Sequence, residues 1–197
     1  MAVYVSMLRG INLGKRRVKM EDLRALYESL ELTDAKTYVQ SGNVVFKSKL
    51  KDERKLASLI EKGIAQRFGF ESGVVLRSAD ELEAVVAANP FAKRKDVHPG
   101  KLLVWFVREA PTAAVRKAVL AVPADPEELK LGEREIYCYF PNGQARPGIK
   151  WASVEKALAV PGTGRNWNSV TQLLEMARAM EAGELIAIWP QKPALHC

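Results

Sequence analysis

Residues 2–19, AVYVSMLRGINLGKRRVK, contain an apolar run followed by a basic loop with two glycines. The run from Ala2 to Leu8 is rich in β-formers and predicts a strand. Met20 to Leu32 follows with apolar residues at helical spacing, and Glu21 and Asp22 occupy the first turn, where the helix dipole favours acidic side chains. The chain is therefore expected to begin with a strand, a basic loop and a helix.

The rest of the first half predicts two short strands, a helix, a strand and a further helix. The turn Ser41-Gly42 separates the two strands, because Gly and Asn tolerate the positive φ of a tight hairpin. Ser78-Ala-Asp-Glu81 has the sequence of a capping box and starts a helix that ends before Pro90. The expected elements are Ala35–Gln40, Asn43–Lys47, Asp52–Phe68, Ser72–Arg77 and the helix after Ser78.

The second half repeats this order of elements without repeating the residues. Leu102–Val107, LLVWFV, is almost continuously apolar, which is typical of a strand buried on both faces. The elements expected after it are Thr112–Ala121 (helix), Glu127–Leu131 and Glu135–Phe140 (strands), a short helix with Val154–Leu158, an extended Gly162–Asn166, Asn168–Ala182 (helix), and a strand or extended tail at Glu184–Trp189.

The order strand-helix-strand-strand-helix-strand predicts an α+β protein with two ferredoxin-like βαββαβ subdomains, each with an extra helix. We place the first subdomain at 1–92, a linker at 93–101, the second subdomain at 102–183 and a C-terminal tail at 184–197. The second face of each sheet is expected either to be covered by the partner half or to form a groove between the halves.

Bulk composition is that of an ordinary globular protein, with 48% apolar and 27% charged residues. No stretch approaches the roughly 20 apolar residues of a membrane helix. The N-terminus lacks the features of a signal peptide, so the cytosol is the expected location and no membrane partner is expected. The two cysteines and two histidines fall outside any metal or disulfide motif, so no metal site is predicted; they are Cys138, Cys197, His98 and His196.

The net charge of +7 is unevenly distributed. Residues 1–20 contain five cations and no acid, whereas the basic run at 93–101 is interpreted as a solvated surface. Backbone N–H groups between a strand and a helix can bind an anion, and glycines allow its close approach. The candidate anion-binding residues of this loop are Arg9, Gly10, Asn12, Gly14 and Lys15.

This loop is not a nucleotide-binding P-loop. Its Gly-x3-Gly-Lys spacing is one residue short, and Arg16 stands where Ser or Thr should hold magnesium. A structural loop turned by glycines, with solvated cations, remains the alternative to anion binding.

Two other polar segments are candidates for the same site. Gln40 and Asn43 could orient a polar ligand, although hairpin formation explains Gly42 and Asn43 better. In the segment Arg165, Asn166 and Trp167, Asn166 or Asn168 could cap the last long helix. A cation next to a helix N-terminus is disfavoured by the dipole, so Arg165 is expected to face a carboxylate or a bound anion.

Three segments, LRGINLGKRRVKMEDL, YVQSGNVVF and GTGRNWNSVTQLLEM, together resemble the bacterial family called domain of unknown function 1697. The resemblance extends in order along nearly the whole chain, implies two similar α+β subdomains, and brings no established activity. Lys15 and Thr163-Gly164 depart from the family pattern, as does the stretch 143–150. The recurrent polar positions of the family correspond to Arg9, Gly10, Asn12, Gly14, Lys19, Gln40, Ser41, Gly42, Asn43, Arg165, Asn166 and Trp167.

Three functions remain open at the level of sequence. The first is binding of an anionic, phosphate-bearing small molecule or nucleotide in a cleft between the halves; no catalytic residue or cofactor is identified, so an enzymatic activity is left open. The second is binding of RNA or DNA, because ferredoxin-like sheets can bind RNA and Tyr137 and Tyr139 share one strand face. The third is protein interaction through the last helix and the Trp189-Pro190 tail, and the oligomeric state is open.

Overall fold

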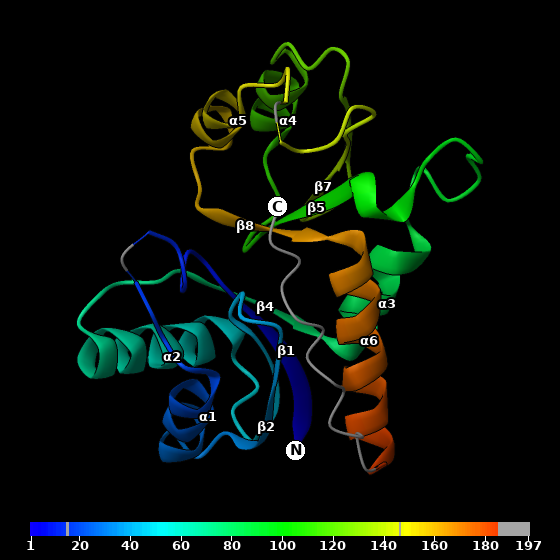
Figure 1. Ribbon diagram of the computed structural model, residues 1–197. Helices are drawn as coiled ribbons and strands as arrows, with labels where there is room; N and C mark the ends of the chain where they lie inside the picture. Colours follow the sequence, from blue (N-terminus) through cyan, green and yellow to red (C-terminus); the bar gives the residue numbers. More distant parts are fainter. Residues whose placement is uncertain (15, 146, 185–197) are drawn as a thin grey trace.

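The computed structural model describes residues 1–14, 16–145 and 147–184. It contains two four-stranded antiparallel sheets, one in the lower and one in the upper part of Figure 1. The strand or tail expected at Glu184–Trp189 lies outside the described residues from position 185 onward. No helix in the described ranges is both long and apolar enough to cross a membrane.

The first half forms a sheet with the strand order β2-β3-β1-β4. Helices α1 and α2 cover one face of this sheet, and α3 lies on the other face. The elements are β1 (Ala2–Leu8), α1 (Met20–Ser29), β2 (Thr33–Tyr38), β3 (Asn43–Ser48), α2 (Glu53–Phe68), β4 (Val74–Ser78) and α3 (Ala79–Ala87).

The second half forms a sheet with the equivalent order, β6-β7-β5-β8. Both orders are those of the ferredoxin-like split βαβ arrangement. The expected order of elements is therefore confirmed in both halves, including the extra helix after the fourth strand. The elements are η1 (Pro99–Lys101), β5 (Leu102–Val107), α4 (Ala113–Leu120), β6 (Glu128–Leu131), β7 (Glu135–Tyr139), α5 (Trp151–Leu158), β8 (Gly162–Asn166) and α6 (Trp167–Ala182).

Local signals position several helix ends where the sequence predicts them. Ser78 and Glu81 form a complete capping box, in which each side chain accepts a hydrogen bond from the other residue's backbone N–H. Asp52 caps α2, and Gly69 ends it in the left-handed conformation with φ +74°. Helix α1 ends at Ser29, three residues before the predicted end, because Glu31 adopts a φ of +59°.

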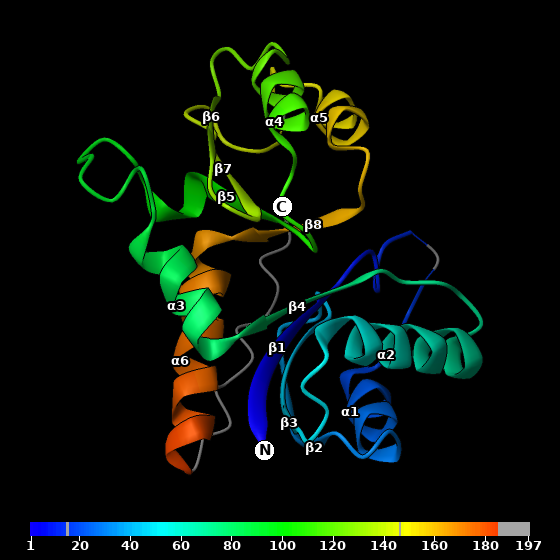
Figure 2. The ribbon, with the colours of Figure 1, turned by 180° about the vertical axis from the view of Figure 1, so that it is seen from behind.

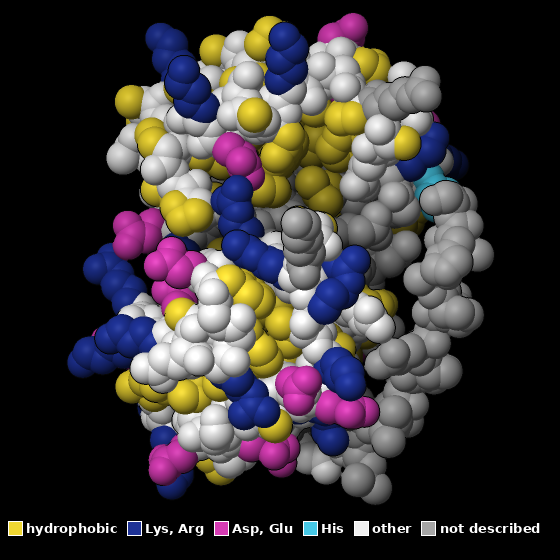
Figure 3. Space-filling model, turned by 60° about the vertical axis from the view of Figure 1, so that its left-hand side comes forward, with side chains coloured by type: hydrophobic (Ala, Val, Ile, Leu, Met, Phe, Trp, Pro, Cys, Tyr) yellow, Lys and Arg dark blue, Asp and Glu magenta, His cyan; other side chains and the backbone are white. Residues whose placement is uncertain are grey.

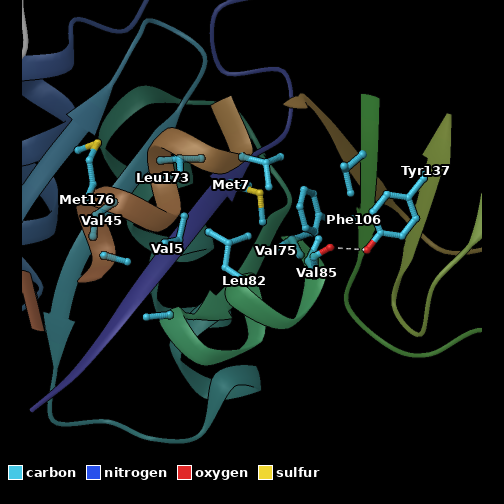
Figure 4. Packing of buried hydrophobic residues seen from close by; sticks show 14 of the residues in the cluster. Val5, Met7, Val45, Val75, Leu82, Val85, Phe106, Tyr137, Leu173 and Met176 are labelled. Atoms are coloured by element: carbon cyan, nitrogen blue, oxygen red, sulfur yellow. Dashed lines mark hydrogen bonds between the residues drawn. The ribbon is translucent and has the colours of Figure 1, made fainter. Parts of the chain in front are cut away.

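One apolar core joins the two halves. Val5 and Met7 of β1 pack in the same cluster as Phe106 of β5, together with residues of α3 and α6 (Figure 4). Helix α6 follows β8 of the second sheet but packs on β1 and β3 of the first, beside α3 (Figures 1 and 2). Of the two expectations for the second sheet face, coverage by the partner half is therefore the one observed. The division into domains at 92 and 102 stays a prediction.

Tyr137 and Tyr139 belong to this core. Both are buried, and the Tyr137 hydroxyl donates a hydrogen bond to the Val85 carbonyl at 2.8 Å (Figure 4). Burial raises the pKa of Tyr137 above its ordinary value. The strand face that suggested RNA stacking is thus occupied by packing within the protein.

A buried ion pair crosses between the halves on the side of β4. The Arg77 side chain is 1% exposed, and its Nη2 lies 2.9 Å from Glu135 Oε1. The same guanidinium donates to the Val107 carbonyl, also at 2.9 Å. Burial lowers the pKa of Arg77, and the nearby Glu135 carboxylate opposes that shift. The pair links the two sheets through charge in addition to apolar packing.

Replacing Arg77 by Met is expected to lower the free energy of unfolding by about 3–5 kcal/mol, because it leaves the Glu135 carboxylate buried without its cation. The matched change Arg54→Gln breaks an exposed pair with Glu109 and should cost less than about 1 kcal/mol. Urea unfolding of both variants measures the difference. Equal losses in the two variants would contradict a stabilising role of the buried pair.

Candidate functional site

A cleft of about 600 Å³ lies where the basic loop of the first half faces the second sheet. Figure 3 shows the molecule hollowed between its upper and lower parts, with hydrophobic side chains in the hollow and Lys or Arg side chains along its lower rim. The lining residues of the first half are Leu8 to Leu13, Gln40 and Ser41; those of the second include Leu103, Trp105, Ile149, Trp151, Glu155 and Gly162 to Arg165.

The side chain of Asn12 holds the basic loop in a closed turn. Its Oδ1 accepts from the Val18 N–H at 2.7 Å, and its Nδ2 donates to the carbonyls of Val18 and Gln40. Both polar groups of this side chain are thus engaged within the protein, and the Asn12 side chain has a structural role at the rim of the cleft. Gly10, with φ +64°, allows the sharp turn that follows β1.

The turn leaves several backbone donors at the cleft. Within the described residues, the N–H groups of Gly10, Ile11 and Asn12 donate to no protein acceptor. The N–H of Arg9 differs, because it donates to the Gly73 carbonyl at 2.8 Å. Successive unpaired N–H groups in a turn can form a concave site for an anion.

The β2–β3 turn packs directly against this loop at Gly42. Gly42 has a φ of +72°, and a Cβ there would lie 2.6 Å from Ile11 Cγ2 and 2.9 Å from Leu8 Cβ. The next residue, Asn43, is buried, and its Nδ2 donates to Ser41 Oγ at 2.7 Å. Asn43 therefore lies behind the cleft wall and organises the turn.

Gly42→Ala is expected to destabilise the protein by about 2 kcal/mol more than Gly69→Ala, because only Gly42 is crowded by the loop. Gly69 has a similar φ of +74° with no neighbouring atom within 4 Å, so its substitution isolates the backbone penalty. Urea denaturation compares the two variants. Equal destabilisation would show that the contact between Gly42 and Ile11 does not constrain the loop.

Arg165 on β8 is a buried cation that ties the cleft together. It is 7% exposed, and all five of its N–H donors are used. Every acceptor is neutral, and no carboxylate among the described residues pairs with it. The acceptors are Asn43 Oδ1, Thr163 Oγ1 at 2.7 Å and the carbonyls of Gly164 (2.7 Å), Leu8 (2.8 Å) and Ser41 (3.2 Å).

Burial lowers the pKa of Arg165 to about 10, which leaves it a cation at neutral pH. Since no free N–H remains, Arg165 has no donor left for a ligand, and its hydrogen bonds hold segments of both halves in place. The carboxylate expected to face Arg165 is thus not among its partners within the described residues, and the bound anion expected as the alternative stays a prediction.

Arg165→Met is expected to lower the free energy of unfolding by about 2–4 kcal/mol, because several acceptors of the two halves lose their donor together. Arg116→Met is the matched control, since Arg116 also lacks a described carboxylate partner but donates only to the Gly132 carbonyl. Thermal and urea unfolding measure both. A loss no larger than that of the control would show that the Arg165 network is not stabilising.

The opposite wall of the cleft is aromatic. Trp105 of β5 and Trp151 of α5 have ring centroids 5.0 Å apart, and their indole N–H groups are buried without an acceptor among the described residues. Gly162 and Gly164 make room for Trp105, because a Cβ at Gly162 would lie 2.1 Å from the indole nitrogen. The glycines thus leave the backbone of β8 bare beside the indole.

Arg9 joins the basic and the aromatic walls. Its Nη2 lies 3.0 Å from Glu155 Oε1, its Nη1 donates to the Gly162 carbonyl, and its guanidinium carbon lies 5.9 Å from the Trp105 ring centroid. The Arg9 side chain is 42% exposed and that of Glu155 is 31% exposed. Unlike Arg165, the Arg9 guanidinium remains accessible to a ligand.

The structure brings five of the ten candidate residues to the cleft and leaves four of the described ones away from it. Asn43, buried behind the turn, and Gly14, exposed at the loop tip, do not line it. Asn166 caps α6 and donates to the Gly100 carbonyl, and Trp167 packs against the core. Lys15 lies outside the described residues. The cleft-lining candidates are Arg9, Gly10, Asn12, Gln40 and Arg165.

Sequence reasoning did not identify the wall formed by Trp105, Trp151 and Glu155. Two features of the sequence point to this wall. Gly162 and Gly164 alternate within one strand, and Trp105 of β5 lies on the same side of the sheet. Within the described ranges, no group of three or more His, Cys, Asp or Glu side chains could hold a metal ion.

The family assignment rests on residues 1–137. They match the family model described as "Protein of unknown function (DUF1697)". The chain belongs to this family. No curated protein matches it.

A solved structure supports the fold of this DUF1697 member. The match is described as conserved bacterial protein SP0830 from Streptococcus pneumoniae, with a TM-score of 0.70 and 24% sequence identity. The match covers 90% of this chain and 99% of the other chain. At this identity the similarity concerns the fold alone.

Proposed function

We propose that the protein binds a small anionic molecule whose apolar or planar part lies against the tryptophan wall of the cleft. The observation that carries this proposal is the meeting of unpaired backbone N–H groups and Arg9 with Trp105 in one cavity of about 600 Å³. Concave sites with apolar walls and a few convergent polar groups are typical of small-molecule binding.

The electrostatics of the cleft favour a negative group. Arg165 has a positive charge that no described carboxylate neutralises, and it is buried next to the loop. A charge in such surroundings is screened less than one in water, so its field reaches the cavity. Gly10, Ile11 and Asn12 supply N–H donors for the anion, and Arg9 supplies a guanidinium.

The apolar wall favours a ligand that is more than a simple anion. Trp105 and Trp151 offer ring surface, and Leu103 and Ile149 extend the apolar lining. Aromatic side chains bind flat groups well through stacking and burial of apolar area. The side chain of Gln40 is exposed at the same cleft and can orient a polar group of the ligand.

The proposal is one of binding, without a reaction class. Among the described lining residues, no nucleophile lies in a hydrogen bond with a general base. Ser41 Oγ receives its hydrogen bond from the Asn43 amide, and Glu155 is paired with Arg9.

Calorimetry and thermal shift with inorganic phosphate, benzoate and the four common nucleoside monophosphates test the proposal. At least one organic anion is expected to bind, and Arg9→Gln should weaken it about tenfold through loss of a charge-assisted hydrogen bond. Arg54→Gln removes the same charge from an exposed ion pair with Glu109 and should leave binding unchanged. The absence of binding by every probe, or equal weakening by both variants, would refute the proposal.

The other two functions have less support. The bases of a nucleic acid cannot stack on Tyr137 and Tyr139 of the second sheet, because both side chains are buried. Protein interaction was inferred partly from the Trp189-Pro190 tail, which lies outside the described residues.

A further inference from the structure

The arginines of this protein fall into two groups by their partners. Within the described residues, most have a carboxylate oxygen within 4.0 Å: Arg9, Arg54, Arg67, Arg77, Arg94, Arg108, Arg134 and Arg178. Those without such a partner are Arg16, Arg17, Arg24, Arg116 and Arg165. All of the second group except Arg116 lie at or next to the basic loop, so arginines without a carboxylate partner are concentrated there.

A second hollow, of about 480 Å³, adjoins the cleft at Gln40, which lines both. Arg17, Lys19 and Arg24 line this basic hollow, and Glu21 is the one carboxylate among its described lining residues. The cleft, with its apolar and aromatic wall, and the positively charged basic hollow thus lie next to each other at Gln40.

Neutral acceptors hold the guanidinium groups of the basic hollow. Arg24 Nη1 donates to Thr37 Oγ1 at 2.8 Å, and Arg17 Nη1 donates to the carbonyls of Gly14 and Arg16. Each guanidinium keeps further N–H donors for a ligand, since an arginine has five. Arginines held in this way lose less side-chain entropy when they bind a phosphate.

We propose that the ligand of the cleft is a nucleoside di- or triphosphate, with its base against Trp105 and Trp151 and its phosphate chain extending past Gln40 into the basic hollow. This inference rests on the proposed function and specifies its ligand class. A single anion would satisfy the N–H groups of the loop and leave the basic hollow uncompensated. A chain of phosphates reaches both and pairs with Arg17, Lys19 and Arg24.

The distribution of charge favours a free nucleotide over a nucleic acid. A strand of nucleic acid has phosphates on both sides of a bound base, so it needs cations on both sides of the base pocket. Across the cleft from the basic loop the described lining is largely apolar, with Ile149 and Trp151, and its charged residues are the acid Glu155 and the cation Arg165. Arg165 has no N–H donor left for a phosphate, because all five are used within the protein. The arginines that keep free N–H donors, Arg9, Arg17 and Arg24, therefore lie on the basic-loop side of the cleft.

Calorimetry with the mono-, di- and triphosphates of the four common nucleosides, without divalent metal, tests this inference. For at least one base, affinity should rise about tenfold or more from mono- to triphosphate. Arg17→Gln and Arg24→Gln, made separately, should each remove most of this gain and leave monophosphate binding within about twofold. Arg116→Gln, which removes a cation also without a described carboxylate partner, is the control and should preserve the gain.

The outcomes separate the two proposals. Equal affinity for mono- and triphosphates overturns the phosphate-chain inference and leaves the proposed anion site standing. A gain that Arg116→Gln reduces as much as the other variants also overturns it, because the effect is then one of net charge. Tighter binding of a single-stranded oligonucleotide than of any triphosphate overturns the free nucleotide as the ligand. The absence of binding by every nucleotide overturns this inference, whereas binding of phosphate or benzoate would still sustain the proposed function.

Discussion

The buried guanidinium of Arg165 is the interaction on which the candidate site depends. It reaches from β8 of the second half to the end of β1 and to the β2–β3 turn of the first. Three segments that are far apart in the sequence therefore meet at one planar group with five donors in fixed directions. The orientation of the basic loop relative to the aromatic wall follows from these hydrogen bonds.

A cation in such surroundings has an unusual energetic balance. Burial disfavours the charged form and lowers the pKa of Arg165 to about 10, yet every N–H group has an acceptor. The hydrogen bonds offset much of the desolvation cost, whereas the net charge is not neutralised by any described carboxylate. Arg77, the other deeply buried arginine in the described part of the chain, has Glu135 beside it. Both arginines therefore link the two halves, Arg77 through a buried carboxylate and Arg165 through neutral acceptors.

The shared core gives this arrangement its rigidity. Because α6 leaves the second sheet and packs on the first, the two halves bury one common apolar cluster. A groove between two independently moving domains would change its shape as they move, whereas here the cleft lies beside a contact that includes β1, β5 and both extra helices. The shared core therefore limits how far the two walls of the cleft can move relative to each other.

The sequence by itself determined the order of the elements and many of their ends, because these depend on interactions within a few residues. Helical spacing, the capping box of Ser78 and the apolar run of β5 are short-range features, and the structure agrees with each of them. The basic loop and its glycines were visible in the same way. The predicted end of α1 differs from the observed one, because no C-terminal glycine marks it in the sequence.

Only the tertiary structure decided which polar residues face the cleft. An asparagine side chain is able to bind a polar ligand. Those of Asn12, Asn43 and Asn166 instead form hydrogen bonds within their own turn or helix cap. Trp105 and Glu155 reach the loop from distant elements, through the register of β5 with β8 and the packing of α5. Side-chain function at this site depends on long-range contacts between the halves, and no pattern in a local window of sequence encodes those contacts.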